Sequence, residues 1–171
     1  LVTGVQTCAL PICKIHKRGR GTDKTPVMGM VERGGRVHTR VAPDVTAKTL
    51  KGAIREMVDK SARIMTDENN AYNGIGADFA GGHATVCHSA GQYVNGEACT
   101  NTAESVFSLL KRGMYGVYHN VSKRHLHRYL AEFDFRWNHR TVEDGERTVA
   151  AIKGSEGKRL MYREPLAEGA A

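Results

Sequence analysis

The sequence predicts an α/β fold in which a sheet packs against an amphipathic helix and further helices follow. Residues 27–41 contain two runs rich in β-branched residues around a Gly-Gly turn, a pattern typical of a β-hairpin. Apolar residues then recur at helical spacing over 44–58, and strand-like segments follow at 63–66 and 83–89. From residue 101 onward the pattern is again helical. This order of strands and helices favours an α/β sheet.

Size and charge restrict the possible functions. At 171 residues the chain is long enough for one domain with a hydrophobic core, but not comfortably for two. Lys and Arg number 25 against 18 Asp and Glu, so the net charge of +7 favours a polyanionic partner such as nucleic acid. No apolar run reaches the roughly 18 residues of a membrane span, and no CxxC pair is present. We therefore expect a cytoplasmic protein. His83, Cys87, His88 and Cys99 are spaced too loosely to favour a zinc site.

The chain opens with an uncharged segment that a basic segment follows at once. A secretory signal would carry its basic residues before the apolar run, whereas here they come after it. Residues 2–12, VTGVQTCALPI, look like the in-frame translation of a widely used short-read sequencing adapter, and Cys13 fits the codon at the junction. We expect residues 1–13 to be foreign to the gene, and the natural sequence before Lys14 to be missing.

Each later element has its own signal. Residues 14–25 are basic and contain glycine, so we expect a loop there. A helix can begin near Asp44, with an apolar face formed by Leu50, Ile54, Met57 and Val58. The strand 63–66 ends immediately before Asp67, and alternating residues indicate another strand at 83–89.

Two helices are expected in the second half. The first covers 101–112, and Ser122 is expected to cap the second. Its apolar stripe consists of Leu126, Tyr129, Leu130, Phe133 and Trp137, which we assign to the core. Beyond residue 140 only 148–152 indicates further helix, and we expect a frayed end.

Two carboxylates are candidates for chemistry. Asp67 ends a predicted strand, and Glu104 lies in the first turn of a predicted helix, on one face with Ser108 and Lys111 and near Asn101. Carboxylates are the ligands that Mg²⁺ prefers, and two such ions can promote cleavage of a phosphodiester. Capping is the alternative: Asp67 can cap the next turn, and Glu104 can reach back to the amide of Asn101.

A basic segment follows the second of these carboxylates. Between Glu104 and Glu132 there is no acid, and residues 111–128 include three histidines and two tyrosines. The cations of this segment are Lys111, Arg112, Lys123, Arg124 and Arg128. Such residues can neutralise DNA phosphates, with tyrosines available to stack on or wedge beside bases. The alternative is a solvated helix face.

Three segments together resemble a known family. They are VMGMVERGGRVHTRVAP, MTDENNAY and TNTAESVFSLLKRGMYGVYHNVSKRHLHRYLAEFDFRWNHR. The chain resembles, from about residue 21 to residue 140, bacterial insertion-sequence transposases of the DDE type, in the branch with an N-terminal zinc ribbon and an RNase H-like catalytic domain of the ISXO type. The third segment is far more specific than scattered acids.

The resemblance implies an RNase H-like fold and metal-dependent DNA cleavage and strand transfer. In such enzymes three acidic positions hold Mg²⁺ or Mn²⁺, and Asp67 matches the second of them. Glu104 matches the third, with Asn101 as the alternative, and Lys111 matches a trailing basic residue that contacts the DNA backbone. The implied partners are element ends, target DNA and a second copy of the enzyme, with no membrane and no small-molecule substrate.

Two departures from the family pattern stand out. Cys99 replaces the usual His at the start of the third segment, and the first catalytic aspartate is missing together with its strand. Asp23, the only acid before Glu32, matches no family position. In the implied strand order 3-2-1-4-5 the missing strand is the central one, although VTGVQ could take the vacancy through its β-propensity.

We therefore expect 26–140 to form a partial RNase H-like domain, followed by a tail at 141–171. Unpaired neighbours of the missing strand would leave it marginally stable. Such a fragment should bind metal poorly and should not cut DNA. A non-catalytic DNA-binding module and an RNase H-like nuclease remain alternatives.

Overall fold

A five-stranded sheet with the order β3-β2-β1-β4-β5 forms the centre of the first of two structural units, Leu1–Asn138. The computed structural model describes residues 2–10, 25–86, 94–95, 98–99 and 101–158. The strands of the sheet are β1 (Val2–Leu10), β2 (Thr25–Glu32), β3 (Val37–Val41), β4 (Arg63–Thr66) and β5 (His83–Thr85). The other elements of this unit are α1 (Ala47–Met57), η1 (Asn70–Tyr72), η2 (Ile75–Asp78), β6 (Val94–Asn95), β7 (Ala98–Cys99), α2 (Asn101–Gly113), η4 (Met114–Tyr118), η5 (Lys123–His125) and α3 (Leu126–Asn138). The second unit, His139–Ala171, contains α4 (Asp144–Ser155).

The predicted hairpin is present and forms one side of the sheet. β2 pairs antiparallel with both β1 and β3, whereas β4 runs parallel to β1 and to β5. Gly34 lies in the hairpin turn at φ +69°, a left-handed conformation that glycine adopts without a Cβ clash. The predicted strand 63–66 is confirmed as β4. The strand expected at 83–89 ends at Thr85, and 87–89 lie outside the described residues.

β1 occupies the central position of the sheet, the place of the native strand that we expected to be missing. It pairs along β2 from Thr3–Glu32 to Leu10–Thr25, and along β4 from Val2–Arg63 to Val5–Thr66. The sheet is therefore complete, because the segment VTGVQ takes the central position, a possibility that its β-propensity had raised. The physical reason is that β2 and β4 each present a row of backbone donors and acceptors that a strand between them can satisfy.

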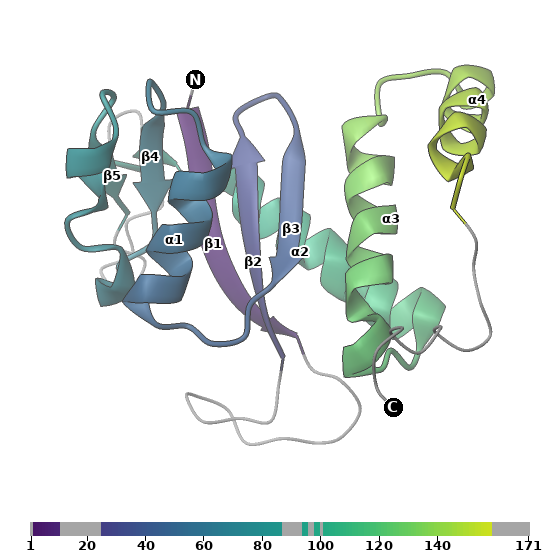
Figure 1. Ribbon diagram of the computed structural model, residues 1–171, viewed down its shortest axis with the longest axis horizontal. Helices are drawn as coiled ribbons and strands as arrows, with labels where there is room; N and C mark the ends of the chain where they lie inside the picture. The colour runs from purple at the N-terminus through teal and green to yellow at the C-terminus, as the bar shows by residue number, and fades with distance from the viewer. Residues whose placement is uncertain (1, 11–24, 87–93, 96–97, 100, 159–171) are drawn as a thin grey trace, which may run out of the picture. The chain divides into compact units, whose positions relative to one another are not determined.

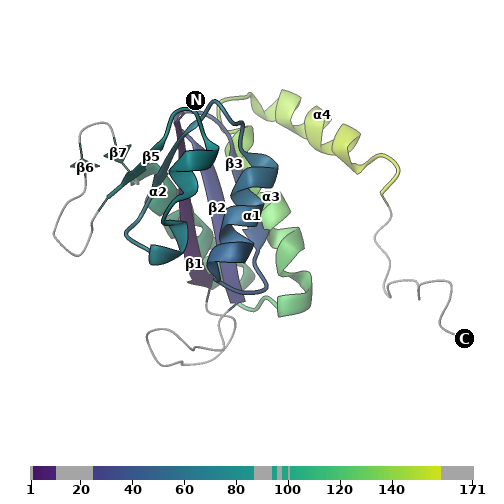
Figure 2. The ribbon, with the colours of Figure 1, turned by 60° about the vertical axis from the view of Figure 1, so that its left-hand side comes forward.

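α1 covers one face of the sheet, and α2 covers the opposite face (Figures 1 and 2). Thr46 caps α1 by accepting the N–H of Thr49, close to the predicted start. Leu50 and Ile54 of α1 are fully buried in one core cluster with Val5 of β1. The predicted apolar face is therefore confirmed except at Met57, whose side chain is exposed at the end of α1. The remaining buried members of this cluster are Met28, Met30, Ala53, Val58, Ala62, Ile64, Tyr72, Ile75 and Phe79.

α2 approaches the sheet closely at a glycine. A Cβ placed on Gly29 of β2 would lie 2.8 Å from Cζ of Phe107 and 3.0 Å from its Cε2. Phe107 belongs to a second core cluster that also contains Val27 of β2 and Leu126 and Leu130 of α3. The absence of a side chain at Gly29 therefore sets how near α2 can come to the sheet.

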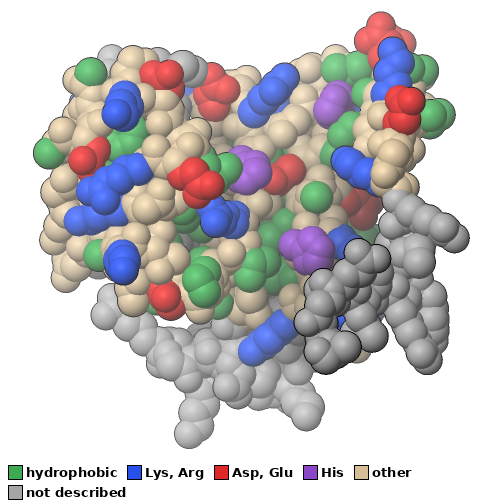
Figure 3. Space-filling model, in the orientation of Figure 1, with side chains coloured by type: hydrophobic (Ala, Val, Ile, Leu, Met, Phe, Trp, Pro, Cys, Tyr) green, Lys and Arg blue, Asp and Glu red, His purple; other side chains and the backbone are tan. Residues whose placement is uncertain are grey.

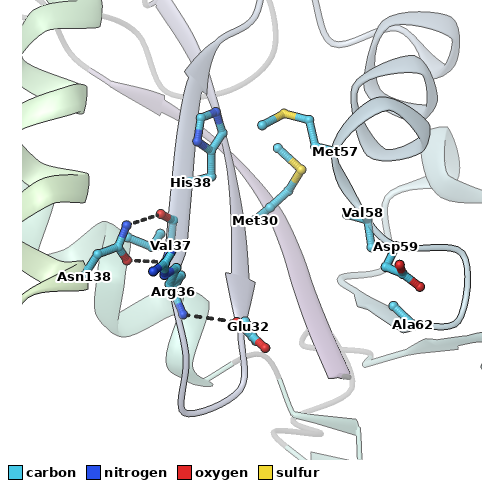
Figure 4. A pocket seen from close by; sticks show the side chains of 10 residues that line it. All are labelled: Met30, Glu32, Arg36, Val37, His38, Met57, Val58, Asp59, Ala62 and Asn138. Atoms are coloured by element: carbon cyan, nitrogen blue, oxygen red, sulfur yellow. Dashed lines mark hydrogen bonds between the residues drawn. The ribbon is translucent and has the colours of Figure 1, made fainter.

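α3 lies beside β3, the edge strand of the sheet (Figure 1), and supplies the hydrogen bonds that a further strand would give. Asn138 Oδ1 accepts the N–H of Val37 at 2.7 Å, and Asn138 Nδ2 donates to the carbonyl of Val37 at 2.9 Å (Figure 4). Asp134 accepts from Thr39 twice, from the backbone N–H at 2.7 Å and from the hydroxyl at 2.8 Å. Two side chains thus satisfy backbone groups of the exposed strand edge.

The helical half differs in detail from the prediction. Ser122 precedes a 3₁₀ turn, η5, and α3 begins only at Leu126. α2 continues into one π-helical turn, η4, that the sequence did not indicate. In the second unit the helical signal at 148–152 belongs to the longer helix α4, and 159–171 lie outside the described residues.

Gly29→Ala should lower the free energy of unfolding by about 1–3 kcal/mol, because its new Cβ would overpack against Phe107. In a Phe107→Leu background the same change should cost less, since the clashing ring is gone. Urea unfolding of the four proteins measures this coupling. Gly52→Ala is the control: no heavy atom from elsewhere lies within 4 Å of its Cβ, and it should stabilise α1 by up to about 1 kcal/mol. Equal costs in both backgrounds would contradict the packing argument.

Asp134→Ala should lower the free energy of unfolding by about 2–3 kcal/mol, because the buried N–H of Thr39 loses its acceptor. Asp134→Asn keeps an acceptor oxygen and should cost less. Burial raises the pKa of Asp134 above 3.8, although the hydrogen bonds from Thr39 oppose that shift. Folding therefore favours the protonated carboxyl group of Asp134. The stability that comes from this preference is full below the unfolded-state pKa and is lost as pH rises through the raised folded-state pKa.

Urea unfolding at several pH values tests the pH dependence that we expect from Asp134. The stability of the wild type relative to Asp134→Asn should fall as pH increases from below 3.8 through the raised pKa. A difference that stays constant over this range would contradict it.

Candidate functional site

Asp67 directly follows β4, at the carboxyl end of that strand. The hydroxyl of Thr66, a fully buried residue, donates to the backbone carbonyl of Asp67 at 2.8 Å. The Oδ1 atom of Asp67 accepts the N–H of Asn69 at 3.3 Å, and the residue is half-buried. The strand and the following turn therefore hold Asp67 at the strand end. The capping role that we considered for it is present in the bond from Asn69.

His83 lies next to this strand end, and no pattern in the sequence indicated its role. Its Nε2 atom is 2.8 Å from the hydroxyl oxygen of Thr66. Because the single hydroxyl hydrogen of Thr66 goes to the carbonyl of Asp67, His83 is the donor in this pair. Burial lowers the pKa of His83, which favours the neutral ring. The parallel pairing of β4 with β5 brings His83 here, and this pairing joins residues distant in sequence.

A hollow of about 450 Å³ on α2 brings two of the predicted residues together. Asn101, at the start of α2, and Glu104, in its first turn, both line it. Its other lining residues are Ser105, Ser108, Leu109 and Arg112. Lys111, in the last turn of α2, is half-buried and is not among them. Asp67 is not among them either, so the structure groups Asn101 with Glu104 but does not join either to Asp67 in this hollow.

The described residues do not fit the metal site that the family implies. Among them, no group of three or more His, Cys, Asp or Glu side chains lies close enough together to hold an ion. β1, with the sequence VTGVQTCAL, contains no acid. Val5 of β1 pairs with Thr66, the last residue of β4, so Gln6 is the residue that would come beside Asp67 if this register continued by one position. Cys87 and His88, which the loose zinc cluster would need, lie outside the described residues.

The predicted cations gather at one corner of the fold. They are Lys111 and Arg112 at the end of α2, Lys123 and Arg124 in η5, and Arg128 in α3, and we call them the basic corner. Leu110, Met114, Val121 and Leu126 share one core cluster, so the packing of α2, η4 and α3 brings these segments together. All of the basic corner is exposed except Lys111, which is half-buried.

The face that carries α1 has a different charge pattern. There, Lys and Arg side chains lie among Asp and Glu side chains (Figure 3). Arg40 pairs with Glu56 at 2.9 Å, and Arg55 pairs with Asp78 at 2.8 Å. Between residues 105 and 131, by contrast, the chain has no acid. The segment that supplies the basic corner is therefore rich in cations and free of acids along the sequence, whereas the α1 face carries both charges.

A second pocket, of about 400 Å³, lies between the hairpin, the end of α1 and Asn138 (Figure 4). His38, Met30 and Met57 lie on its walls, and none of the predicted site residues lines it.

No helix in the described parts of the chain is long and apolar enough to span a bilayer.

Comparison with known proteins identifies the fold and the family of the chain. The chain is 36% identical over 126 residues to "Uncharacterized protein in transposable element ISH50" from Halobacterium salinarum; the match covers 71% of this chain and 42% of the length of that relative. The crystal structure of the catalytic core domain of BIV integrase resembles it with a TM-score of 0.58 at 13% identity, over 90% of this chain and 97% of that one. This likeness shows the RNase H-like fold.

A family model described as the ISXO2-like transposase domain matches residues 12–138. The match includes Asp67, Asn101, Glu104 and the whole basic corner. It ends at Asn138, whose side chain hydrogen-bonds the backbone of the edge strand β3. The chain therefore belongs to the ISXO2-like transposase domain family.

Proposed function

We propose that the chain is the catalytic domain of an insertion-sequence transposase that holds DNA against the α2–α3 side of its fold. The observation that carries this proposal is the basic corner, five cations without an intervening acid, packed onto an RNase H-like sheet. Phosphate contacts of this kind position DNA without reading its sequence. The residues that we propose for cleavage and strand transfer in the intact protein are Asp67, Glu104 and Lys111. Asn101 is the alternative to Glu104.

Mg²⁺ or Mn²⁺ would supply Lewis-acid chemistry at the phosphodiester in the intact protein. We derive no such step for the present chain, because β1 offers no carboxylate beside Asp67. The chain should therefore bind DNA but not cut it. We further propose that residues 1–13 are foreign to the gene. The domain proper is 26–140, and a tail follows at 141–171. The intact protein acts on element ends and target DNA as a cytoplasmic homodimer.

A non-catalytic DNA-binding module is the second candidate. The acid-free strand β1 favours it, since DNA affinity from the basic corner needs no metal. The two candidates differ in one respect: a catalytic domain needs a carboxylate beside Asp67 before it gains metal affinity, whereas a binding module gains nothing from one.

The affinity of the chain for duplex DNA should fall steeply with salt, because cations that contact phosphates release counterions. Replacing Lys123 or Arg112 by Ala should weaken binding to unrelated sequences equally and reduce the salt slope by about one each. Fluorescence anisotropy across a salt series measures this. Lys51→Ala on α1 is the matched control and should change neither quantity, because it lies on the face of mixed charge. Affinity that is independent of salt would refute the proposal.

Gln6→Asp should create divalent-metal affinity, because it adds a carboxylate at the register position beside Asp67. Titration with Mn²⁺, monitored by calorimetry, should show tighter binding than in the unchanged chain. Gln6→Asn is the matched control, similar in size but uncharged, and should show no gain. Combining Gln6→Asp with Asp67→Asn should abolish the gain. If Gln6→Asp binds no more metal than Gln6→Asn, the catalytic assignment of Asp67 fails, whereas DNA binding by the basic corner stands.

A further inference from the structure

Two large hydrophobic side chains are exposed inside the basic corner. Tyr115 is 61% exposed and Val117 is 70% exposed, and both lie in the π-helical turn η4 that follows α2. Among the described residues, exposed apolar side chains also occur elsewhere, but these two are flanked on both sides in the sequence by cations, Lys111 and Arg112 before them and Lys123 after them. An exposed apolar pair that lies between cations in the sequence is suited to a ligand with both charged and apolar parts.

The structure holds these two side chains outward. Met114, the first residue of η4, is buried in the core cluster beneath the basic corner, and Tyr118, its last residue, packs edge-on against Tyr129 of α3 at 4.7 Å. Both ends of the turn are thus anchored, while Tyr115 and Val117 between them are not buried. π turns are rare, and many occur at functional sites.

The backbone after this turn has an unusual conformation. His119 has φ +55°. It is the only residue other than glycine with a positive φ among the residues that the structure describes. Such a conformation is uncommon for residues other than glycine and is retained where the surroundings enforce it. Here it ends the π turn and leads the chain toward Val121, which is buried in the same core cluster.

We propose that Tyr115, supported by Val117, stacks on an unpaired base of DNA whose phosphates are held by the basic corner. A nucleic-acid strand fits because its phosphates meet Lys111, Arg112 and Lys123 while its bases offer flat apolar faces. Aromatic side chains between phosphate-binding cations are the usual means of holding such bases. The occupant is therefore DNA with a locally unpaired base, such as a flap or a mismatch. This inference rests on the proposed DNA binding and adds the state of the bound DNA.

The test compares two labelled DNAs, a fully paired duplex and the same duplex with one unpaired 2-aminopurine. The chain should bind the second DNA about tenfold more tightly and quench its fluorescence, because stacking both adds affinity and quenches the base. Tyr115→Ala should abolish the preference and the quenching without changing the salt slope. Tyr115→Phe should restore both, since the ring is retained.

Matched controls separate this effect from a general loss of structure. Tyr118→Phe keeps the packed ring and should leave the preference unchanged, as should Ile152→Ala, which removes an exposed apolar side chain of α4. Urea unfolding should show that Tyr115→Ala leaves the fold intact, because the side chain is mostly exposed.

Each remaining outcome overturns the inference. If Tyr115→Ala keeps the preference and the quenching, the stacking role is wrong although DNA binding by the basic corner stands. If Tyr115→Ala instead changes the oligomeric state measured by sedimentation and leaves DNA preference unchanged, the two side chains contact a second copy of the chain. If the unchanged chain binds neither DNA, the proposed function fails together with this inference.

Discussion

The contact between Phe107 and Gly29 determines where α2 lies on the sheet. Phe107 stands above a position without a side chain, so the helix can approach β2 to a distance that any Cβ would prevent. From this contact α2 extends in two directions: its first turn carries Asn101 and Glu104, and its last turn carries Lys111 and Arg112. A shift of α2 by one turn, about 5 Å, would move both groups together. Both candidate functions of the helix therefore depend on one packing contact.

α3 completes the same arrangement through hydrogen bonds. Asp134 and Asn138 satisfy the open edge of β3, which fixes the C-terminal half of α3 beside the sheet. The other end of α3 then lies in the core cluster with Leu110 and Met114, next to the end of α2. The bonds to Val37 and Thr39 are polar contacts that hold α3 along the edge strand. The carboxamide and carboxylate side chains thus protect an edge and bring Arg128 to the basic corner at the same time.

The sequence predicted those parts of the fold whose signals are local. The hairpin around Gly34, the strand before Asp67 and the apolar face containing Leu50 each follow from neighbouring residues, and each is present. The stripe on α3 was predictable for the same reason: Leu126 and Leu130 are buried, and Tyr129, Phe133 and Trp137 are partly buried against the core clusters. What the periodicity missed depends on pairing between distant segments. The bond between His83 and Thr66 needs β4 beside β5, and the caps on β3 need α3 beside an edge.

β1 is a further element whose neighbours the sequence could not specify. Its place in the sheet could be anticipated only as an accident of β-propensity, because VTGVQ carries no signal that names its neighbours. Backbone pairing requires little of side chains, so two strand edges accept a central strand whether or not it carries catalytic residues. Burial of Val5 in the α1 cluster supplies the remaining specificity, since a shift of one residue would turn it to the other face. The fold can therefore be complete while the candidate site is not.

This separation extends to function. The basic corner is built from residues 111–128, which are close in sequence and share one core cluster, so its formation requires only α2, its π turn and the start of α3. A set of metal-binding carboxylates would require three segments from distant parts of the chain, β1, β4 and α2, each with an acid in register. Phosphate attraction is also additive and tolerant of position, whereas metal coordination fails when one ligand is absent. On the proposed function, a chain of this family with an acid-free β1 should therefore lose metal chemistry first and retain the proposed affinity for DNA.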